Sequence, residues 1–263
     1  METLLYLVTG VCAGLLSGML GVGGGLIIVP LLTLMFTRLQ FPDAHIMHLA
    51  LGTSLATIIA TSISSARSHH SHGNVNWQAV RLISPGIIIG ALLGAGMAAQ
   101  MHSDWLKWLF ALFVLYVGTQ MLLDFSPPPG HRLPGTIGLA TVGALIGILS
   151  SLVGIGGGTL SVPFLIYCNC PARSAIGTSA SIGIFIALAG SAGYIAAGWQ
   201  VAGLPEPSLG FVYLPAFAGI TLASIVSAPF GVRLAQRLPV ALLKKLFALL
   251  LYVLGLKMLW SLL

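Results

Sequence analysis

Long apolar stretches alternate with short polar breaks along the whole chain. Five of them precede the polar segment at 124–135: 3–20, 26–37, 47–66, 80–100 and 105–123. Five follow it: 136–153, 159–167, 172–197, 211–235 and 241–262. A helix of about 20 residues crosses a bilayer, and the stretches at 26–37 and 159–167 are too short to do so comfortably. The pattern predicts an all-α membrane protein with about eight membrane helices and two short segments.

The polar segment, DFSPPPGHRLPG at 124–135, divides the chain into two similar parts. Three blocks recur in the same order on both sides of it: GVGGGLIIVPLL with GIGGGTLSVPFL, ALGTSLA with AIGTSAS, and LFALFVLYVGTQML with LFALLLYVLGLKML. This order predicts an internal duplication, which is typical of transporters. We expect a first transmembrane repeat over 1–125, a linker over 126–135 and a second repeat over 136–263.

The basic residues indicate how the two repeats are oriented. Arginine and lysine gather in the loops at 67–81, 124–135, 171–174 and 233–245, and are absent from 198–210. Basic loops favour the cytoplasmic side. These loops share one side only if each glycine-containing hairpin enters and leaves by the same face, so that each half makes three full crossings. The repeats are then inverted and both termini lie outside. If the short segments span instead, the repeats are parallel.

The repeated glycine motif predicts a broken helix. Consecutive glycines weaken a helix, and proline is preferred in a helix's first turn. We therefore expect an unwound segment at 21–29 followed by a short helix that starts at Pro30, with a second such helix starting at Pro163. Free N–H groups and the helix dipole at these starts favour anions. Close helix packing by small residues is the alternative explanation of the glycines.

The second repeated block adds hydroxyl groups to this predicted anion site. Each copy carries a Gly-Thr-Ser sequence near the start of a long apolar helix. Hydrogen bonds between helices are the other interpretation of these hydroxyls. The candidate substrate-binding residues are Gly21, Gly23, Gly24, Gly25, Pro30, Thr53, Ser54, Gly154, Gly156, Gly157, Gly158, Pro163, Thr178 and Ser179.

Composition narrows the class of function. The chain is 57% hydrophobic and 6% charged, which is far too little charge to solvate a soluble surface. The net charge of +6 comes without a basic, aromatic-rich cluster, so nucleic-acid binding is not expected. The five acidic residues lie at loops or ends of apolar stretches, which argues against a buried proton relay. With no catalytic motif in the apolar stretches, we expect neither an enzyme nor a cofactor.

Two polar clusters remain without a predicted role. His69, His70 and His72 could ligate a metal, although a solvated loop explains them as well. Cys168 and Cys170 form a C-x-C pair, which is a weak metal or sulfur-carrier signal, and cysteine often serves as a small apolar residue. We predict no metal site.

The paired GxGGGxxxVP motifs, each followed by a GTS helix, together with HGNVNW at 72–77, resemble the TauE/SafE family of sulfite exporters. The resemblance covers essentially the whole chain. It implies a multi-pass permease of the bacterial inner membrane that moves sulfite, thiosulfate or organosulfonates. In that membrane, the outer side that the basic loops predict for both termini is the periplasm. It also implies that Gly21–Pro30 and Gly154–Pro163 carry the site.

Two other functions stay open at this stage. A channel would conduct the same anions faster and without counterflow, and a transporter of an unrelated small organic anion would need the same helix-end site. The expected partners are a small anion and the lipid bilayer, and the sequence leaves a homo-oligomer open.

Overall fold

The computed structural model describes residues 2–20, 24–123, 130, 133–237 and 240–262, and these are mainly helical. A two-stranded antiparallel ribbon, β1 (Ser208–Leu209) and β2 (Val212–Tyr213), precedes the ninth helix. The helices are α1 (Glu2–Leu20), α2 (Gly25–Arg38), α3 (Ile46–Ser71), α4 (Trp77–Gln100), α5 (Ser103–Leu122), α6 (Thr136–Val153), α7 (Gly158–Tyr167), α8 (Ala172–Gly198), α9 (Leu214–Arg237) and α10 (Val240–Trp260).

The predicted all-α membrane class is confirmed, with the short ribbon as the one β element among the described residues. Each apolar stretch forms a helix. Within the described part of the chain, six helical segments are long and apolar enough to cross a membrane: Asp43–Ser71, which joins α3 to the preceding 3-10 turn, α4, α5, α6, α8 and Leu214–Gly231 of α9. The two short stretches form α2 and α7, of 14 and 10 residues. The predicted linker lies mostly outside the described residues.

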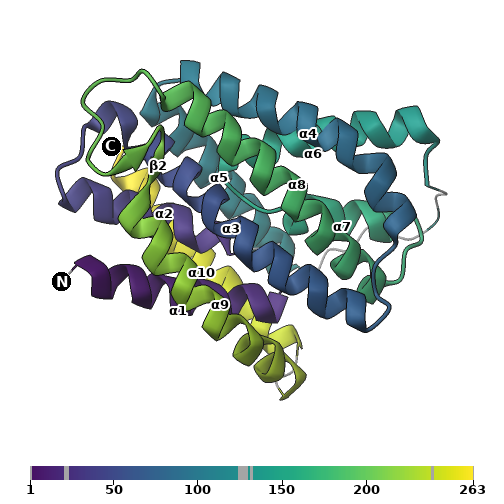
Figure 1. The fold of residues 1–263 in the computed structure, drawn as a ribbon. Helices are drawn as coiled ribbons and strands as arrows, with labels where there is room; N and C mark the ends of the chain where they lie inside the picture. Colours follow the sequence, from purple (N-terminus) through teal and green to yellow (C-terminus); the bar gives the residue numbers. More distant parts are fainter. Residues whose placement is uncertain (1, 21–23, 124–129, 131–132, 238–239, 263) are drawn as a thin grey trace.

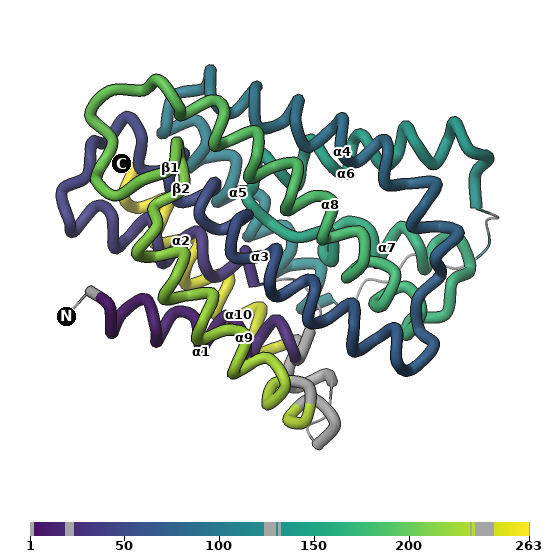
Figure 2. The backbone as a smooth tube through the Cα atoms, viewed as in Figure 1, coloured from purple at the N-terminus to yellow at the C-terminus, as the bar shows by residue number. Residues whose placement is uncertain are grey.

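The two halves of the sequence interlock. Helices α3 and α8 run side by side through the middle of the bundle, while α1 packs along α9, α4 along α6 and α5 along α10 (Figures 1 and 2). In two of these contacts, α1 with α9 and α4 with α6, glycines lie close to the backbone of the partner helix; a β-carbon at Gly14, for example, would lie 2.6 Å from the carbonyl oxygen of Ser224. Small residues therefore set the spacing between halves.

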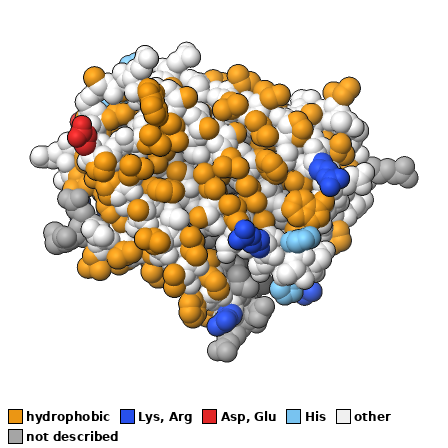
Figure 3. Space-filling view, viewed as in Figure 1, with side chains coloured by type: hydrophobic (Ala, Val, Ile, Leu, Met, Phe, Trp, Pro, Cys, Tyr) orange, Lys and Arg blue, Asp and Glu red, His pale blue; other side chains and the backbone are white. Residues whose placement is uncertain are grey.

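The surface is that of a protein surrounded by lipid. Apolar side chains cover most of the face in Figure 3, and the Lys and Arg side chains on it lie toward its right and lower parts. Large side chains on the outer helices are strongly exposed, among them Leu93, Tyr116 and Val226. Such a continuous apolar exterior is unfavourable in water and suits a bilayer.

Candidate anion-binding site

The short helices begin earlier than the prolines predict. Helix α2 begins at Gly25 and α7 at Gly158, so Pro30 and Pro163 lie inside helices and the predicted start at proline is wrong. The carbonyl of Gly24 accepts the first helical bonds from the amides of Ile27 and Ile28, at 3.0 and 3.1 Å. The glycine turn, not the proline, therefore ends the irregular segment. At these positions, past the first turn, proline removes its own N–H bond and crowds the carbonyl four residues earlier.

The irregular backbone is consequently shorter than expected. In the second motif it covers Gly154, Ile155, Gly156 and Gly157, all of them buried. In the first motif Gly24 is the described part of the turn, with a left-handed φ of 76° that favours glycine. The candidate residues Gly21 and Gly23 lie outside the described residues.

The two glycine motifs meet in the buried centre of the protein. A β-carbon at Gly25 would lie 2.6 Å from the carbonyl oxygen of Gly154 and 2.9 Å from the Cα atom of Ile155. In the same contact, a β-carbon at Gly154 would lie 3.1 Å from a Cγ atom of Val29. The φ of Gly154 is 65°, in the left-handed region. Only glycine permits this approach, so the start of α2 lies directly against the turn that precedes α7.

Two of the predicted serines hold the second motif. The Ser54 hydroxyl on α3 donates to the carbonyl of Gly154 at 2.8 Å. On α8, the Ser179 hydroxyl bonds to the Ser161 hydroxyl at 2.6 Å, and Ser161 donates to the carbonyl of Gly157. Both GTS helices therefore reach the turn between α6 and α7.

The two predicted threonines have a different contact, and it is reciprocal. Thr53 Oγ1 accepts the backbone N–H of Tyr213, and Thr178 Oγ1 accepts the backbone N–H of Asn76, each at 2.9 Å. Thr53 on α3 thus bonds to the segment before α9, and Thr178 on α8 bonds to the segment before α4. Each of these hydrogen bonds joins the two halves. These hydrogen bonds fit the helix-bonding interpretation of the two hydroxyls.

Further hydroxyl groups beside the second motif were missed by the sequence analysis. Within the part of the chain that the structure describes, the side-chain oxygens of Ser150, Ser151 and Thr159 are buried without a hydrogen-bond partner. Ser150 and Ser151 close α6, and Thr159 lies in the first turn of α7, where amide groups lack intrahelical partners. A consecutive Ser-Ser pair directly before the glycines was the available signal. Buried donors without partners are what a bound anion requires.

The predicted histidine and cysteine clusters lie elsewhere. His70 Nδ1 accepts the indole N–H of Trp77 at 3.2 Å, and His72 bonds to the carbonyl of Ser68 at 2.7 Å. Within the described residues, no group of three or more His, Cys, Asp or Glu side chains is arranged to hold a metal ion. These two histidines are used in local bonds at the end of α3.

A small cavity of about 220 Å³ is lined by a different set of histidines. His48 bonds through Nε2 to the carbonyl of Ala98 at 3.0 Å, and its ring lies 5.0 Å from that of Phe211. The Nδ1 atoms of His45 and His48 are buried, and neither has a hydrogen-bond partner among the residues that the structure describes. The residues of the glycine motifs do not line this cavity.

Comparison with known proteins gives a consistent family. The family profile described as sulfite exporter TauE/SafE matches residues 6–258. A "probable membrane transporter protein" of Haemophilus influenzae is 40% identical over 256 residues, which are 97% of each chain. Proteins of the same description from Methanocaldococcus jannaschii and Bacillus subtilis are 27% and 26% identical over 97% and 75% of this chain, and 94% and 80% of theirs. No solved structure matches.

Proposed function

The chain belongs to the TauE/SafE family of membrane transporters, and we propose that it moves small sulfur-containing anions, such as sulfite, thiosulfate or organosulfonates, through a site between its two halves. The bacterial inner membrane is the proposed location, with both termini in the periplasm. The observation that carries the proposal is the meeting of the two glycine motifs, where the helix ends that flank the second motif carry buried hydroxyl groups without a hydrogen-bond partner among the described residues.

The chemistry of this region suits an oxyanion. The start of α7 supplies free amides and the positive end of a helix dipole. Ser150, Ser151 and Thr159 add hydroxyl donors, while no acidic side chain among the described residues belongs to the glycine motifs or their flanking helix ends. Neutral donors bind an anion without the strong attraction of a buried arginine, which favours release. The proposed substrate-binding residues are Gly24, Gly25, Pro30, Thr53, Ser54, Gly154, Gly156, Gly157, Gly158, Pro163, Thr178 and Ser179, with Gly21 and Gly23 outside the described residues.

We further propose that the repeats, 1–125 and 136–263, are inverted. Equivalent threonines make equivalent bonds, and equivalent helix pairs, α1 with α9 and α6 with α4, are the most extensive contacts between halves. Alternating access would then be a rocking of one half against the other about the glycine contact.

Transport assays in proteoliposomes test the function. We expect uptake of radiolabelled sulfite, thiosulfate or an anionic organosulfonate, and counterflow when the vesicles are preloaded with the unlabelled anion. Flux without counterflow would instead identify a channel. No flux of any of these anions, and no binding, would refute the proposal.

Hydroxyl variants test the site. Ser151→Ala and Thr159→Val remove hydroxyls that have no hydrogen-bond partner among the described residues, so they cost this part of the fold no hydrogen bond. We expect each to weaken anion binding by about tenfold, since a hydrogen bond to a charged group is worth roughly 1.5–3 kcal/mol. Thr141→Val is the matched control, because Thr141 lies on the exposed face of α6 and bonds to its own helix. Unchanged binding in both site variants would move the site elsewhere.

A further inference from the structure

A large cavity of about 970 Å³ lies between α1, α2 and α10. Its walls are mainly apolar and come from all three helices, for example Leu16, Leu31 and Leu250. Its volume is at the upper end of the range for ligand pockets, about 300–1,000 Å³. The cavity is therefore large enough for a sizeable apolar group.

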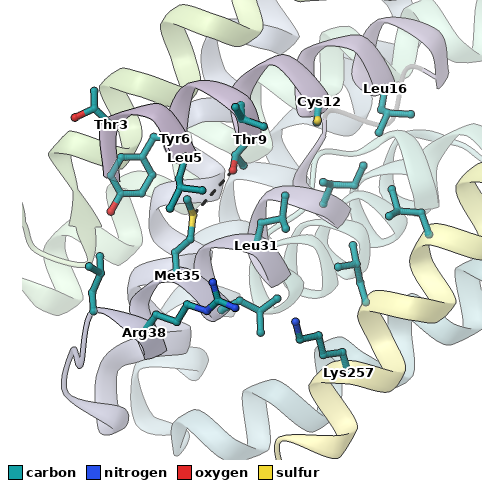
Figure 4. Close-up of a pocket in the computed structure, with 16 residues that line it drawn as sticks. Thr3, Leu5, Tyr6, Thr9, Cys12, Leu16, Leu31, Met35, Arg38 and Lys257 are labelled. Carbon is teal, nitrogen blue, oxygen red and sulfur yellow. Dashed lines mark hydrogen bonds between the residues drawn. The ribbon is translucent and has the colours of Figure 1, made fainter. Parts of the chain in front are cut away.

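The cavity carries its charge at one end. Arg38 is the last residue of α2 and Lys257 lies in the last turn of α10, and Figure 4 shows the two side chains extending toward each other. None of the described lining residues is acidic. The ion pair found among the described side chains joins Lys107 to Asp104, so both cations face the cavity without an acidic partner there. This end attracts an anion.

The opposite end is apolar. Ile27 lies near the start of α2, at the other end of that helix from Arg38, and Leu250 lies about two turns before Lys257 on α10. Along one rim, Leu5 and Val8 of α1 both line the cavity and are about half exposed, at 46% and 52%. The cavity is thus continuous with the apolar surface that faces the bilayer. A ligand that fits it has a negative head and an apolar tail, and it arrives from the membrane.

We propose that this cavity binds an anionic phospholipid, with the phosphate between Arg38 and Lys257 and an acyl chain along α1, α2 and α10. The two cations lie near helix ends, where lipid headgroups lie, and the apolar walls continue toward the middle of the bundle. A zwitterionic lipid fits the same walls but gains less from the two charges. The inference stands apart from the identity of the transported anion.

Cys12 provides a direct readout of occupancy. It lines the cavity and is exposed, whereas Cys168 is buried. The probe is palmitoyl-oleoyl-phosphatidylglycerol, compared with the matching phosphatidylcholine at equal mole fraction in the same zwitterionic detergent. The rate at which N-ethylmaleimide labels Cys12 is followed at the peptide level by mass spectrometry. We expect phosphatidylglycerol to slow the labelling and phosphatidylcholine to slow it much less.

Charge variants show whether the two cations cause this preference. Because each surface cation contributes about a fivefold effect, Arg38→Gln and Lys257→Gln should each raise the half-protecting lipid concentration about fivefold, and the double variant should lose the preference. Arg81→Gln/Lys245→Gln removes two exposed cations outside the cavity and should keep it. Equal protection by both lipids in the unmodified protein, or a preference that survives in Arg38→Gln/Lys257→Gln, would overturn the proposal.

Discussion

Ser54 is the side chain that joins the two halves at the candidate site. Its hydroxyl is fully buried on α3 and bonds to the carbonyl of Gly154, 100 positions later in the chain. In Ser54→Ala that carbonyl loses a buried partner, so we expect a loss of about 1–2 kcal/mol in stability. Thermal unfolding in detergent measures the effect. Thr57→Val is the control, since that hydroxyl bonds within its own helix, to the carbonyl of Ser54. Equal unfolding temperatures for the two variants would contradict the role of this bond.

The thiols of Cys168 and Cys170 both have a raised pKa. Burial is the larger cause that raises the pKa of the Cys168 thiol, and the neighbouring Cys170 raises it further. Burial also raises the pKa of the Cys170 thiol. A raised pKa leaves less thiolate at every pH below it, and thiolate is the reactive form and the metal ligand. We therefore expect both to react with iodoacetamide more slowly near pH 8 than in the denatured chain, with the rate rising only at higher pH. Identical pH profiles in folded and denatured protein would contradict this.

Helix packing makes a prediction at the level of elements. Helix α4 presents Gly94 to α6, where a β-carbon would lie 2.6 Å from the carbonyl oxygen of Ile148, while Gly96 on the same helix faces open space. We expect Gly94→Ala to lower stability by about 1–3 kcal/mol through overpacking, and Gly96→Ala to be neutral or stabilising because alanine favours a helix. Unfolding temperatures of the two variants compare them directly. A similar loss in both would mean that glycine flexibility, and not close approach, matters in α4.

The sequence predicted the presence of the helices better than it predicted their first residues. Apolar length predicted the two short helices at 26–37 and 159–167, and the structure has them at Gly25–Arg38 and Gly158–Tyr167. Their first residues were misplaced because the local preference of proline for a first turn was given too much weight. Burial of the residues before Pro30 stabilises a helix there despite the missing N–H and the crowding of the carbonyl four residues before the proline. Propensity is a weak guide where packing is dense.

The candidate site could be predicted only as two separate segments. The repeated glycines pointed to both motifs, and the two serines do reach the second of them. The sequence carries no distance information between residues 25 and 154, so their contact emerges only from the packing of α3 between α2 and α8. The hydroxyls of Ser150 and Ser151 were missed because serine in an apolar helix ordinarily bonds to its own backbone.

The orientation of the two repeats governs the whole molecule, and equivalent loops test it. His72 follows α3 and Gln200 follows α8, so the two residues occupy corresponding places in the repeats. In inverted repeats they lie on opposite sides of the membrane, whereas in parallel repeats they lie on the same side. The background is a variant in which Cys12, Cys168 and Cys170 are serine. In intact cells we expect a membrane-impermeant maleimide to label Gln200→Cys and not His72→Cys. His72→Cys should react only after permeabilisation, because the basic loop that follows α3 favours the cytoplasm. Labelling of both positions, or of neither, in intact cells would require parallel repeats and would remove the rocking mechanism built on their inversion.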